Sequence, residues 1–397
     1  MSLPRFIQIH TLHNYPAALL NRDDAGLAKR LPMGDKIRTR ISSQCLKRHW
    51  RVADDHFSLA SLGVPMAIRS RQTLDLIRRT LIEQGVSEAL AQAAAEALRN
   101  GGLLDKAGKE LKGEDALATG QAVLLGKAEI DYLVARCTAL AQENTDEKSL
   151  KTAVAKFLKD DKNNLASMRH GSGLESALFG RMVTSDVLAS RDAAVYVAHA
   201  FTVHEAQVEN DYFTVVDDLL RDAGELGSAG IFDTELASGL YYGYVVVDVP
   251  QLVANLEGIG IKDCFSAEPA QRELAGQVVH HLLHLIATVS PGAKRGSTAP
   301  FDWAKFVLVE TGDWQPRSLA GAFQNALPLA TPNIRQAAVQ RLADEAAKLD
   351  AAYGAPLQRR YLALDDVSVS GAERLPLAAL ADWVQARIVA GATPTGA

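Results

Sequence analysis

A basic segment between positions 34 and 51 carries side chains that bind phosphate groups. It reads GDKIRTRISSQCLKRHWR and holds no acidic residue after Asp35. Arg38 and Arg40 are two residues apart, so on an extended segment both face the same side. Beyond them, polar and basic residues recur at intervals of three or four and line one stripe of a helix: Gln44, Lys47, Arg48 and Arg51. This pattern suits contact with the backbone of a nucleic acid.

The start of that helix adds a further phosphate-binding device. Ser42 or Ser43 offers an N-cap for a helix over Gln44–Asp54. The free N–H groups of a helix N-terminus receive anions. The arginine strand, the helix start and the basic stripe can therefore converge on a single backbone. The alternative is a solvated basic surface, but solvated helices usually interleave charges of both signs, and this segment does not.

Positive charge is concentrated near the start of the sequence, although the net charge of the whole chain is negative. The 397 residues carry a net charge of −5, which by itself argues against nucleic-acid binding. Residues 1–51, however, hold ten Lys/Arg and three Asp, a net of +7, which leaves −12 for the remainder. A basic region in an otherwise acidic chain is a better indicator of a nucleic-acid footprint than the total charge.

Composition excludes several other classes of protein. The length suggests two or three domains, or one domain with a large insertion, and 48% hydrophobic with 22% charged residues is ordinary for a globular protein. No apolar run approaches the roughly 18–20 residues that span a bilayer, and the N-terminus lacks the apolar stretch of a signal peptide. Cys45, Cys137 and Cys264 are odd in number and far apart, which argues against disulfides or a CxxC zinc site. We therefore expect a cytoplasmic protein without a membrane partner.

Strand patterns at both ends of the chain enclose a long helical region. β-forming residues predict strands over Phe6–Leu12 and Ile37–Ile41. From about 68 to 179 apolar residues recur at helical spacing, and no strand pattern interrupts them. Strand elements split around a helical insertion suggest an α+β core of the ferredoxin-like type. The later segments alternate between the two patterns, with strand runs at 193–203, 241–249 and 306–309 and helical runs at 268–289, 334–353 and 377–389.

Histidines and aspartates raise two other possibilities. His280 and His284 are four residues apart, as metal ligands can be, but the run is not HExxH and no third ligand is near, so packed or surface histidines are favoured. His10 and His13 near the first strand could suggest a ribonuclease, and Asp23 and Asp24 could be acids for RNA cleavage, although spacing alone defines no pair of base and acid. The two aspartates equally suit a turn cap or a partner for a neighbouring arginine.

Two adjacent aromatic residues, Tyr212 and Phe213, are open to two interpretations. They are either core residues of a strand or part of an exposed hairpin. Acidic residues on both sides favour the exposed hairpin: Glu209, Asp211, Asp217 and Asp218.

Ordered motifs along the chain resemble one known family. The turn N21-RDD-24 is followed by G34-DKIRTRISSQCLKR-48. This order resembles the CasC family of the RAMP superfamily, the backbone subunit of the type I-E CRISPR surveillance complex, Cascade, whose members begin with a strand, an NRDD turn and a basic RISSQxLKR segment. The similarity continues in the same order over essentially the whole chain, through GRMVTS (180–185), DYFTVVDDL (211–219) and PGAK (291–294).

The resemblance implies an architecture and a role. The fold would be α+β, with an RRM/ferredoxin-like palm over 1–60 and 180–397, a helical fingers domain over 61–179 and a β-hairpin thumb at about 203–227. Copies would line up head to tail on CRISPR guide RNA and support its pairing with a target DNA strand in antiviral defence. The other Cascade subunits (large, small, 5′-end cap and guide-processing) would be partners. The chain would be no enzyme and would hold no cofactor or metal; the alternative is an RNA endonuclease of the same superfamily.

The resemblance also assigns roles to individual residues. Met182 would press against a base where the guide is kinked. Tyr212 and Phe213 would be the wedge of a thumb that crosses the guide–target duplex, although Trp is familiar at the first wedge position. Besides Arg38, which the strand pattern suggests, the residues that would contact the guide backbone are Arg22, Lys29, Arg40, Ser42, Gln44, Lys47, Arg48, Arg51 and Lys294.

Overall fold

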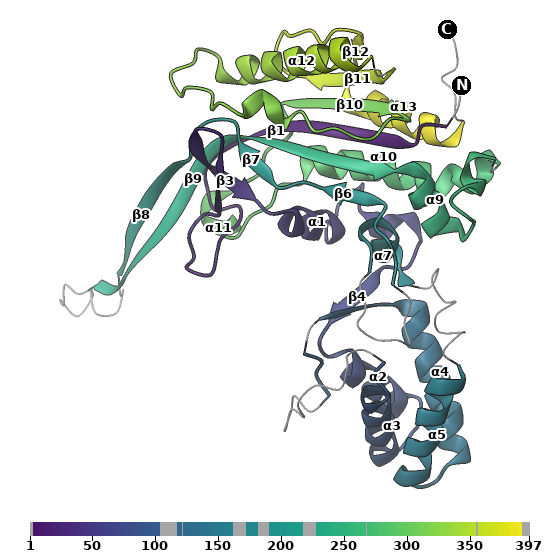
Figure 1. The fold of residues 1–397 in the computed structure, drawn as a ribbon. Helices are drawn as coiled ribbons and strands as arrows, with labels where there is room; N and C mark the ends of the chain where they lie inside the picture. Colours follow the sequence, from purple (N-terminus) through teal and green to yellow (C-terminus); the bar gives the residue numbers. More distant parts are fainter. Residues whose placement is uncertain are drawn as a thin grey trace. The chain divides into compact units, whose positions relative to one another are not determined.

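A computed structural model describes residues 3–103, 117–120, 122–161, 172–181, 190–216, 228–266, 268–354 and 356–390. The chain forms two compact units, each assembled from separate segments (Figure 1). Unit 1 comprises 1–59, 196–248 and 276–397, and unit 2 comprises 60–195 and 249–275. Unit 2 thus contains the expected fingers and also two segments that the sequence analysis placed in the palm, 180–195 and 249–275. These join unit 2 because Asn255 Nδ2 donates to Ala177 O (2.8 Å) and Asp192 O (3.0 Å) there.

A ten-stranded, mostly antiparallel sheet forms the centre of the fold. Its order is β12-β11-β10-β1-β9-β7-β3-β2, and β6 and β8 also pair with β9. The N-terminal strand is central because β1 pairs with both β9 and β10. The strands are β1 Phe6–Ala18, β2 Arg30–Met33, β3 Lys36–Ile41, β6 Val195–Val197, β7 Ala200–Thr202, β8 Gln207–Val216, β9 Ser228–Asp248, β10 Phe306–Gly312, β11 Gln358–Ala363 and β12 Ala372–Arg374.

Alternation along β1 assigns the two faces of this sheet to different helices (Figure 1). Leu12 packs on the face that α12 (Ile334–Tyr353) covers. Thr11 lies on the opposite face, beneath α1 (Ser43–Arg51) and α10 (Glu273–Thr288). Successive side chains of a strand point to opposite sides, so β1 is buried on both. The remaining helical elements of unit 1 are α11 (Arg295–Thr298), η6 (Ala320–Phe323) and α13 (Leu377–Val389).

A buried charged network lies on the α12 face. His10 of β1 is 0% exposed, and its Nε2 lies 3.2 Å from Glu310 Oε2. Arg317 donates to Glu310 (2.6 Å), and Arg359 bridges Glu310 and Asp350. Burial alone would raise the pKa of Glu310, but hydrogen bonds and charges of His10 and Arg317 outweigh it and hold that pKa well below its usual range. The network therefore depends on an ionised Glu310.

Unit 2 is mainly helical, but it also contains strands. The expectation that no strand interrupts this region is wrong, because β4 (Ala67–Ser70) and β5 (Val123–Gly126) form an antiparallel pair. Each strand has four residues, too few for alternation to be told from the start of a helix. Apart from the first turn of α10, the helical elements with described residues in unit 2 are η1 (Leu59–Leu62), α2 (Thr73–Glu83), α3 (Glu88–Asn100), α4 (Lys127–Glu143), α5 (Glu147–Asp160), α7 (Leu174–Phe179), α9 (Val249–Glu257), η4 (Asp263–Phe265) and η5 (Pro269–Arg272).

Candidate nucleic-acid interface

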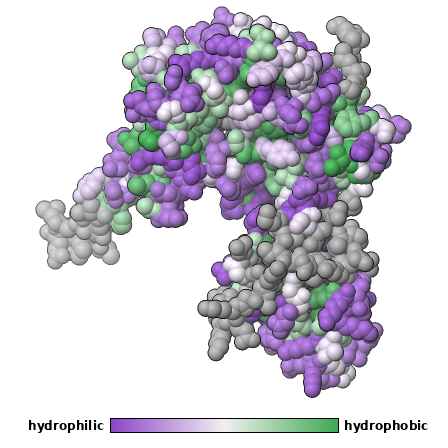
Figure 2. Space-filling model, in the orientation of Figure 1, coloured by the Kyte–Doolittle hydropathy of each residue, from purple (hydrophilic) through white to green (hydrophobic). Residues whose placement is uncertain are grey.

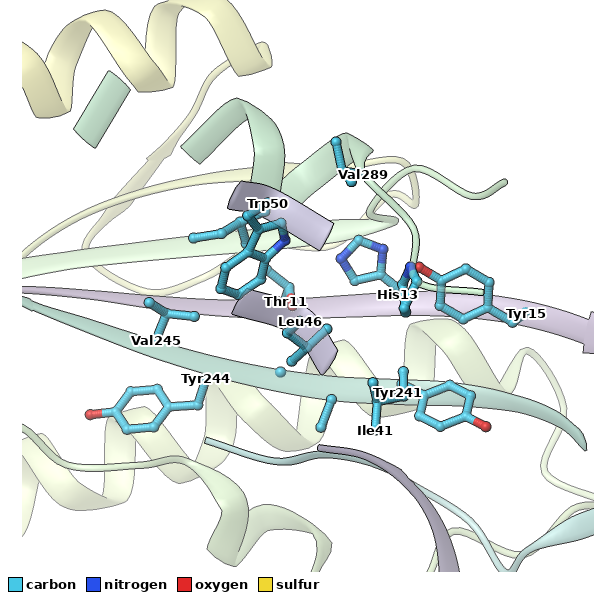
Figure 3. A pocket seen from close by; sticks show the side chains of 14 residues that line it. Thr11, His13, Tyr15, Ile41, Leu46, Trp50, Tyr241, Tyr244, Val245 and Val289 are labelled. Carbon is cyan, nitrogen blue, oxygen red and sulfur yellow. The ribbon is translucent and has the colours of Figure 1, made fainter. Parts of the chain in front are cut away.

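Helix α1 is fixed to the sheet by its cap and by two apolar side chains. The Ser42 hydroxyl accepts from the Cys45 amide (3.3 Å), and the Ser42 amide donates to Asn21 Oδ1 (2.8 Å), which confirms the predicted cap. Leu46 and Trp50 lie against β1 and β9, and Trp50 is 3% exposed (Figure 3). The cavity beneath them is about 30 Å³, room for little more than a water molecule. Because this face is packed, the opposite face of α1 has a defined position.

The basic stripe on α1 has an exposed and a half-buried edge. Gln44 and Arg48 are exposed. Lys47 and Arg51 are half-buried, and each makes other contacts in the structure. Burial lowers the pKa of Lys47. The side chains of α1 best placed to meet a ligand from solvent are therefore Gln44 and Arg48.

Arg38, which the sequence placed on the phosphate-binding side, is instead buried. Its side chain is 0% exposed, and its guanidinium donates to the carbonyl oxygens of Thr202 (3.1 Å) and Phe323 (3.1 Å). The turn between β2 and β3 closes over it, because Asp35 in that turn accepts a hydrogen bond from the Ala326 amide (2.9 Å). Arg38 therefore joins distant segments of unit 1 and is removed from the candidate surface.

The same turn depends on Gly34. Its φ is +61°, a conformation that glycine adopts at little cost. A Cβ at this position would lie 1.6 Å from Gln324 O, so no side chain fits. The turn that covers Arg38 is thus held at both its glycine and its aspartate.

Lys29, Arg40 and His199 come together where α1 begins. Arg40 Nη1 lies 3.3 Å from His199 Nδ1, and the Ser43 amide donates to the same nitrogen (3.4 Å). Burial, and then the charges of Arg40 and Lys29, lower the pKa of His199. Two donors that suit a phosphate thus converge on one imidazole nitrogen. His199 lies 156 residues from Ser43 and no local pattern marks it, so the sequence alone does not predict its place in this cluster.

Arg48 connects this cluster to two further cations. Burial raises the pKa of the Cys45 thiol to about 11, and the nearby charges of Lys29 and Arg48 oppose the rise. Burial also lowers the pKa of His49, and the charges of Arg295 and Arg48 lower it further. Hydrogen bonds join the same segments: the Arg40 amide donates to Lys29 O (2.7 Å), the Cys45 thiol of α1 to Leu20 O (3.7 Å), and the Ala293 amide before α11 to Leu19 O (2.8 Å). The cations of these segments therefore form one region, which we call the basic surface: Lys29, Arg40, Arg48, Lys294 and Arg295.

Lys294 joins the basic surface to the β8–β9 hairpin. Its Nζ donates to Thr234 Oγ1 on β9 and lies 5.4 Å from the centre of the Phe213 ring on β8. The amide of the preceding Ala293 donates to Leu19 O (2.8 Å), which ties this turn to the chain just after β1. The predicted guide contact at Lys294 and the predicted wedge at Phe213 are therefore neighbours.

The hairpin itself extends from the sheet (Figure 1), and both hydrophobic and hydrophilic residues are visible on its surface (Figure 2). Tyr212 is 64% and Phe213 39% exposed, so the prediction of an exposed hairpin is confirmed. Phe213 stacks on Phe232 across the strands, with ring centroids 5.6 Å apart. The hairpin is longer than the predicted 203–227, because its second strand runs from Ser228 to Ser238, opposite Gln207.

Arg22 and Met182 are two further residues with a predicted contact to the guide. Arg22 is exposed, in a turn whose Asp23 Oδ1 accepts from the amides of Ala25 (2.9 Å) and Leu27 (3.0 Å). The turn-cap interpretation of Asp23 is thereby confirmed. Met182 lies outside the described residues.

A known family accounts for nearly all of this chain. The family model described as CT1975-like protein matches residues 7–386. The chain belongs to the CT1975-like family. No curated protein matches it.

Two solved structures resemble this CT1975-like protein over almost its whole length. One is a chain from a "CRISPR RNA-guided surveillance complex, pre-nicking", with 29% identity and a TM-score of 0.78 over 96% of this chain and 99% of that one. The other, from a "CRISPR RNA-guided surveillance complex", has 26% identity and a TM-score of 0.66 over the same shares. The mixed α/β architecture is thus shared with subunits of such complexes.

The histidines of the CT1975-like protein that the sequence offered as catalytic or metal-binding residues contact other side chains of the fold. His10 is buried in the Glu310 network. His284 stacks on Phe57, with centroids 3.6 Å apart, and His280 lies 3.2 Å from Asp382 Oδ1. Among the described residues, no group of three or more His, Cys, Asp or Glu is placed to hold a metal ion. Nor is any described helix long and apolar enough to cross a membrane.

Proposed function

We propose that this protein is a non-catalytic backbone subunit of a CRISPR surveillance complex, of the type I-E Cascade class, which binds guide RNA. The observation that carries the proposal is the basic surface, where cations from separate chain segments meet beside a capped helix start. Its ligand is the sugar–phosphate backbone, since a guide of arbitrary sequence has to be held without reading its bases. The family match and the two similar complexes support this role in antiviral defence.

Within that role, the residues of the basic surface and of α1 make different contacts with the guide. Arg40, Arg48 and the start of α1 hold the guide backbone through charge and hydrogen bonds. Gln44, Arg22 and Lys29 lie on or beside the same surface, and Lys47, Arg51 and Met182 complete the proposed contact. Ser42 acts through its cap, which aims the helix start, because its hydroxyl is already used within the helix.

The hairpin supplies the thumb of the proposed function. Tyr212, with most of its ring exposed, presents a flat face to a base pair, and stacking on such a face is worth roughly 1–3 kcal/mol per base whatever the sequence. Phe213 is held between Phe232 and Lys294, so it supports the wedge. In this proposal the thumb crosses the duplex of guide and target DNA strand and displaces a base pair.

The wider assembly is part of the same proposal. Copies line up head to tail along one guide in the cytoplasm, with an RRM-like palm in unit 1 and fingers in unit 2. The large, small, 5′-end cap and guide-processing subunits complete the complex. We favour this role over the alternative, an RNA endonuclease, because His10 is buried and Asp23 caps its own turn.

A binding assay tests the proposal directly. The purified chain is mixed with single-stranded RNAs of several unrelated sequences, with and without Mg²⁺. We expect similar affinity for each sequence, intact RNA after incubation, and multimers on long RNA that short RNA does not support. Strong preference for one sequence, RNA cleavage or the absence of RNA binding would each contradict it.

A further inference from the structure

His199 occupies two hydrogen-bond donors that the proposed function assigns to a phosphate of the guide. Arg40 Nη1 lies 3.3 Å from its Nδ1, and the Ser43 amide nitrogen at the start of α1 lies 3.4 Å from the same atom. A guanidinium and a backbone amide nitrogen donate hydrogen bonds and do not accept them. Nδ1 is therefore the acceptor for both, which places the single proton of the neutral imidazole on Nε2.

Other contacts hold both donors in place. The Nε of Arg40 donates to Arg30 O (3.2 Å), which fixes the plane of the guanidinium. The Ser43 amide is fixed because the helix start is capped, with the Ser42 hydroxyl accepting from the Cys45 amide (3.3 Å). The two donors thus stay directed at one point. A single acceptor at that point, whether an imidazole nitrogen or a phosphate oxygen, satisfies both.

The imidazole reaches this point because its backbone is fixed on both sides. The Ala198 amide donates to Tyr244 O on β9 (2.9 Å), and Ala200 pairs with Ile41 of β3. The side chain of His199 itself is exposed. The main chain therefore positions the ring against the two donors, while a ligand in solvent still has access to it.

The charges that act on His199 are positive. They belong to Arg40 on β3 and to Lys29 in the segment before β2, and they add to burial in lowering the pKa of His199. From α1 the ring meets the uncharged amide of Ser43. At neutral pH the ring of the free protein is therefore mainly neutral. A bound phosphate would reverse this balance, because its negative charge favours the protonated ring.

Protonation also changes what Nδ1 does. Once Nδ1 carries a hydrogen it is a donor, so it no longer accepts from Arg40 or from the Ser43 amide. Three donors then face the same point, and an anionic oxygen is the acceptor that satisfies all three. The neutral ring therefore competes with a phosphate for the two donors, whereas the protonated ring helps to bind it.

We propose that His199 is a proton-linked positioning residue for the guide backbone. In the free protein its unprotonated Nδ1 holds the Arg40 and Ser43 donors, and a phosphate oxygen takes that place as Nδ1 binds one proton from solvent. This role rests on the proposed function, since its ligand is the RNA backbone at the basic surface. It adds a dependence on pH that Lys and Arg do not supply, because their charges stay constant near neutral pH.

Fluorescence anisotropy with a labelled oligouridylate at constant salt tests the link between protons and RNA. Uracil neither gains nor loses a proton near neutral pH, so a change in affinity belongs to the protein. Because the complex binds one proton more than the free protein, affinity should rise as the pH falls, by at most about tenfold per pH unit. Between about pH 8 and about pH 5.5, which bracket the usual pKa of histidine, we expect wild type to gain about tenfold in affinity.

Two substitutions of His199 separate the acceptor from the proton. His199→Asn keeps an acceptor near the place of Nδ1 but does not take up a proton, so its affinity should hardly depend on pH. At about pH 5.5 it should bind about tenfold more weakly than wild type, as the loss of one charge-assisted hydrogen bond predicts. His199→Ala removes the acceptor and leaves both donors to the phosphate. It should therefore bind RNA several-fold more tightly than wild type at about pH 8, again with little dependence on pH.

His49 provides the matched control, because it is a second histidine near cations of the basic surface, Arg48 and Arg295. Its Nδ1 lies 2.8 Å from the Cys45 carbonyl oxygen of its own helix, so it occupies no donor at the helix start. His49→Gln should keep the pH dependence of wild type. The same dependence in His199→Asn as in wild type, or its loss in His49→Gln, overturns the assignment.

The remaining outcomes distinguish this proposal from the proposed function. If wild type binds RNA with an affinity that does not change with pH, the role of His199 fails and the RNA-binding role stands. Weaker binding by His199→Ala than by wild type at about pH 8 also overturns the proposal, since His199 would then be an ordinary contact rather than a competitor. If wild type binds no RNA at any pH, the proposed function fails and this role fails with it.

Discussion

Removal of three cations from the basic surface should flatten the salt dependence of RNA binding. Lys29, Arg40 and Arg48 come from separate segments: the charges of Lys29 and Arg48 act on Cys45, and those of Lys29 and Arg40 act on His199. Each cation that neutralises a phosphate of a single strand contributes about 0.7 to the slope of log K against log salt. Replacing all three with Ala should therefore lower the slope by about 2, and the deficit against wild type should shrink about 20-fold between 50 and 200 mM salt.

Fluorescence anisotropy with a labelled single-stranded RNA over that salt range measures this slope. The matched control removes three exposed lysines elsewhere, Lys156, Lys159 and Lys348, and so changes the net charge equally. Its slope should stay at the wild-type value. An unchanged slope in the first variant, or an equal loss in the control, would refute the assignment of the basic surface.

Further predictions concern the buried groups and the hairpin. Arg38→Ala should cost about 3 kcal/mol in the free energy of unfolding, because it leaves buried carbonyls without a donor, yet keep the RNA salt slope unchanged; denaturant titration and anisotropy measure the two. The lowered pKa of Glu310 contributes stability that is present above about pH 4.5 and is lost as the pH falls below it. The free energy of unfolding of the wild type should therefore fall steeply below that pH. Glu310→Gln should have a lower free energy of unfolding at neutral pH, and that free energy should depend less on pH. Tyr212→Ser should leave the melting temperature unchanged while it reduces binding to a guide–target duplex, whereas a melting temperature that falls by several degrees would show that Tyr212 is structural.

The sequence predicted the helices whose cap, apolar periodicity and end residue lie within the helix or directly beside it. The Ser42 cap starts α1 as expected, and the helix over 334–353 ends at Gly354, whose φ of +68° suits a helix terminus. Apolar periodicity was equally sufficient for the last helix, Leu377–Val389. These elements are confirmed because cap, period and stop signal agree within a few residues.

The departures all depend on distant partners. Arg38 shares its strand and residue type with Arg40, and only the docking of Phe323 and Thr202 makes one structural and leaves the other on the surface. His199 belongs to the candidate site through contacts made across the fold, which spacing along the chain does not reveal. The β4–β5 pair was missed for a related reason, since each short strand is defined by its partner rather than by its own pattern.

The central place of β1 has a consequence for how the chain is made. Phe6 pairs with Gly312 of β10, so during synthesis β1 waits for a neighbour encoded roughly 300 residues later. At ordinary elongation speeds of 5–20 residues per second, that wait is roughly 15–60 s. During it, an apolar strand has no complete sheet to join and is open to wrong pairing. A reading frame cut before Phe306 therefore leaves β1 with β9 as a neighbour but without β10, so one edge of this strand stays unpaired.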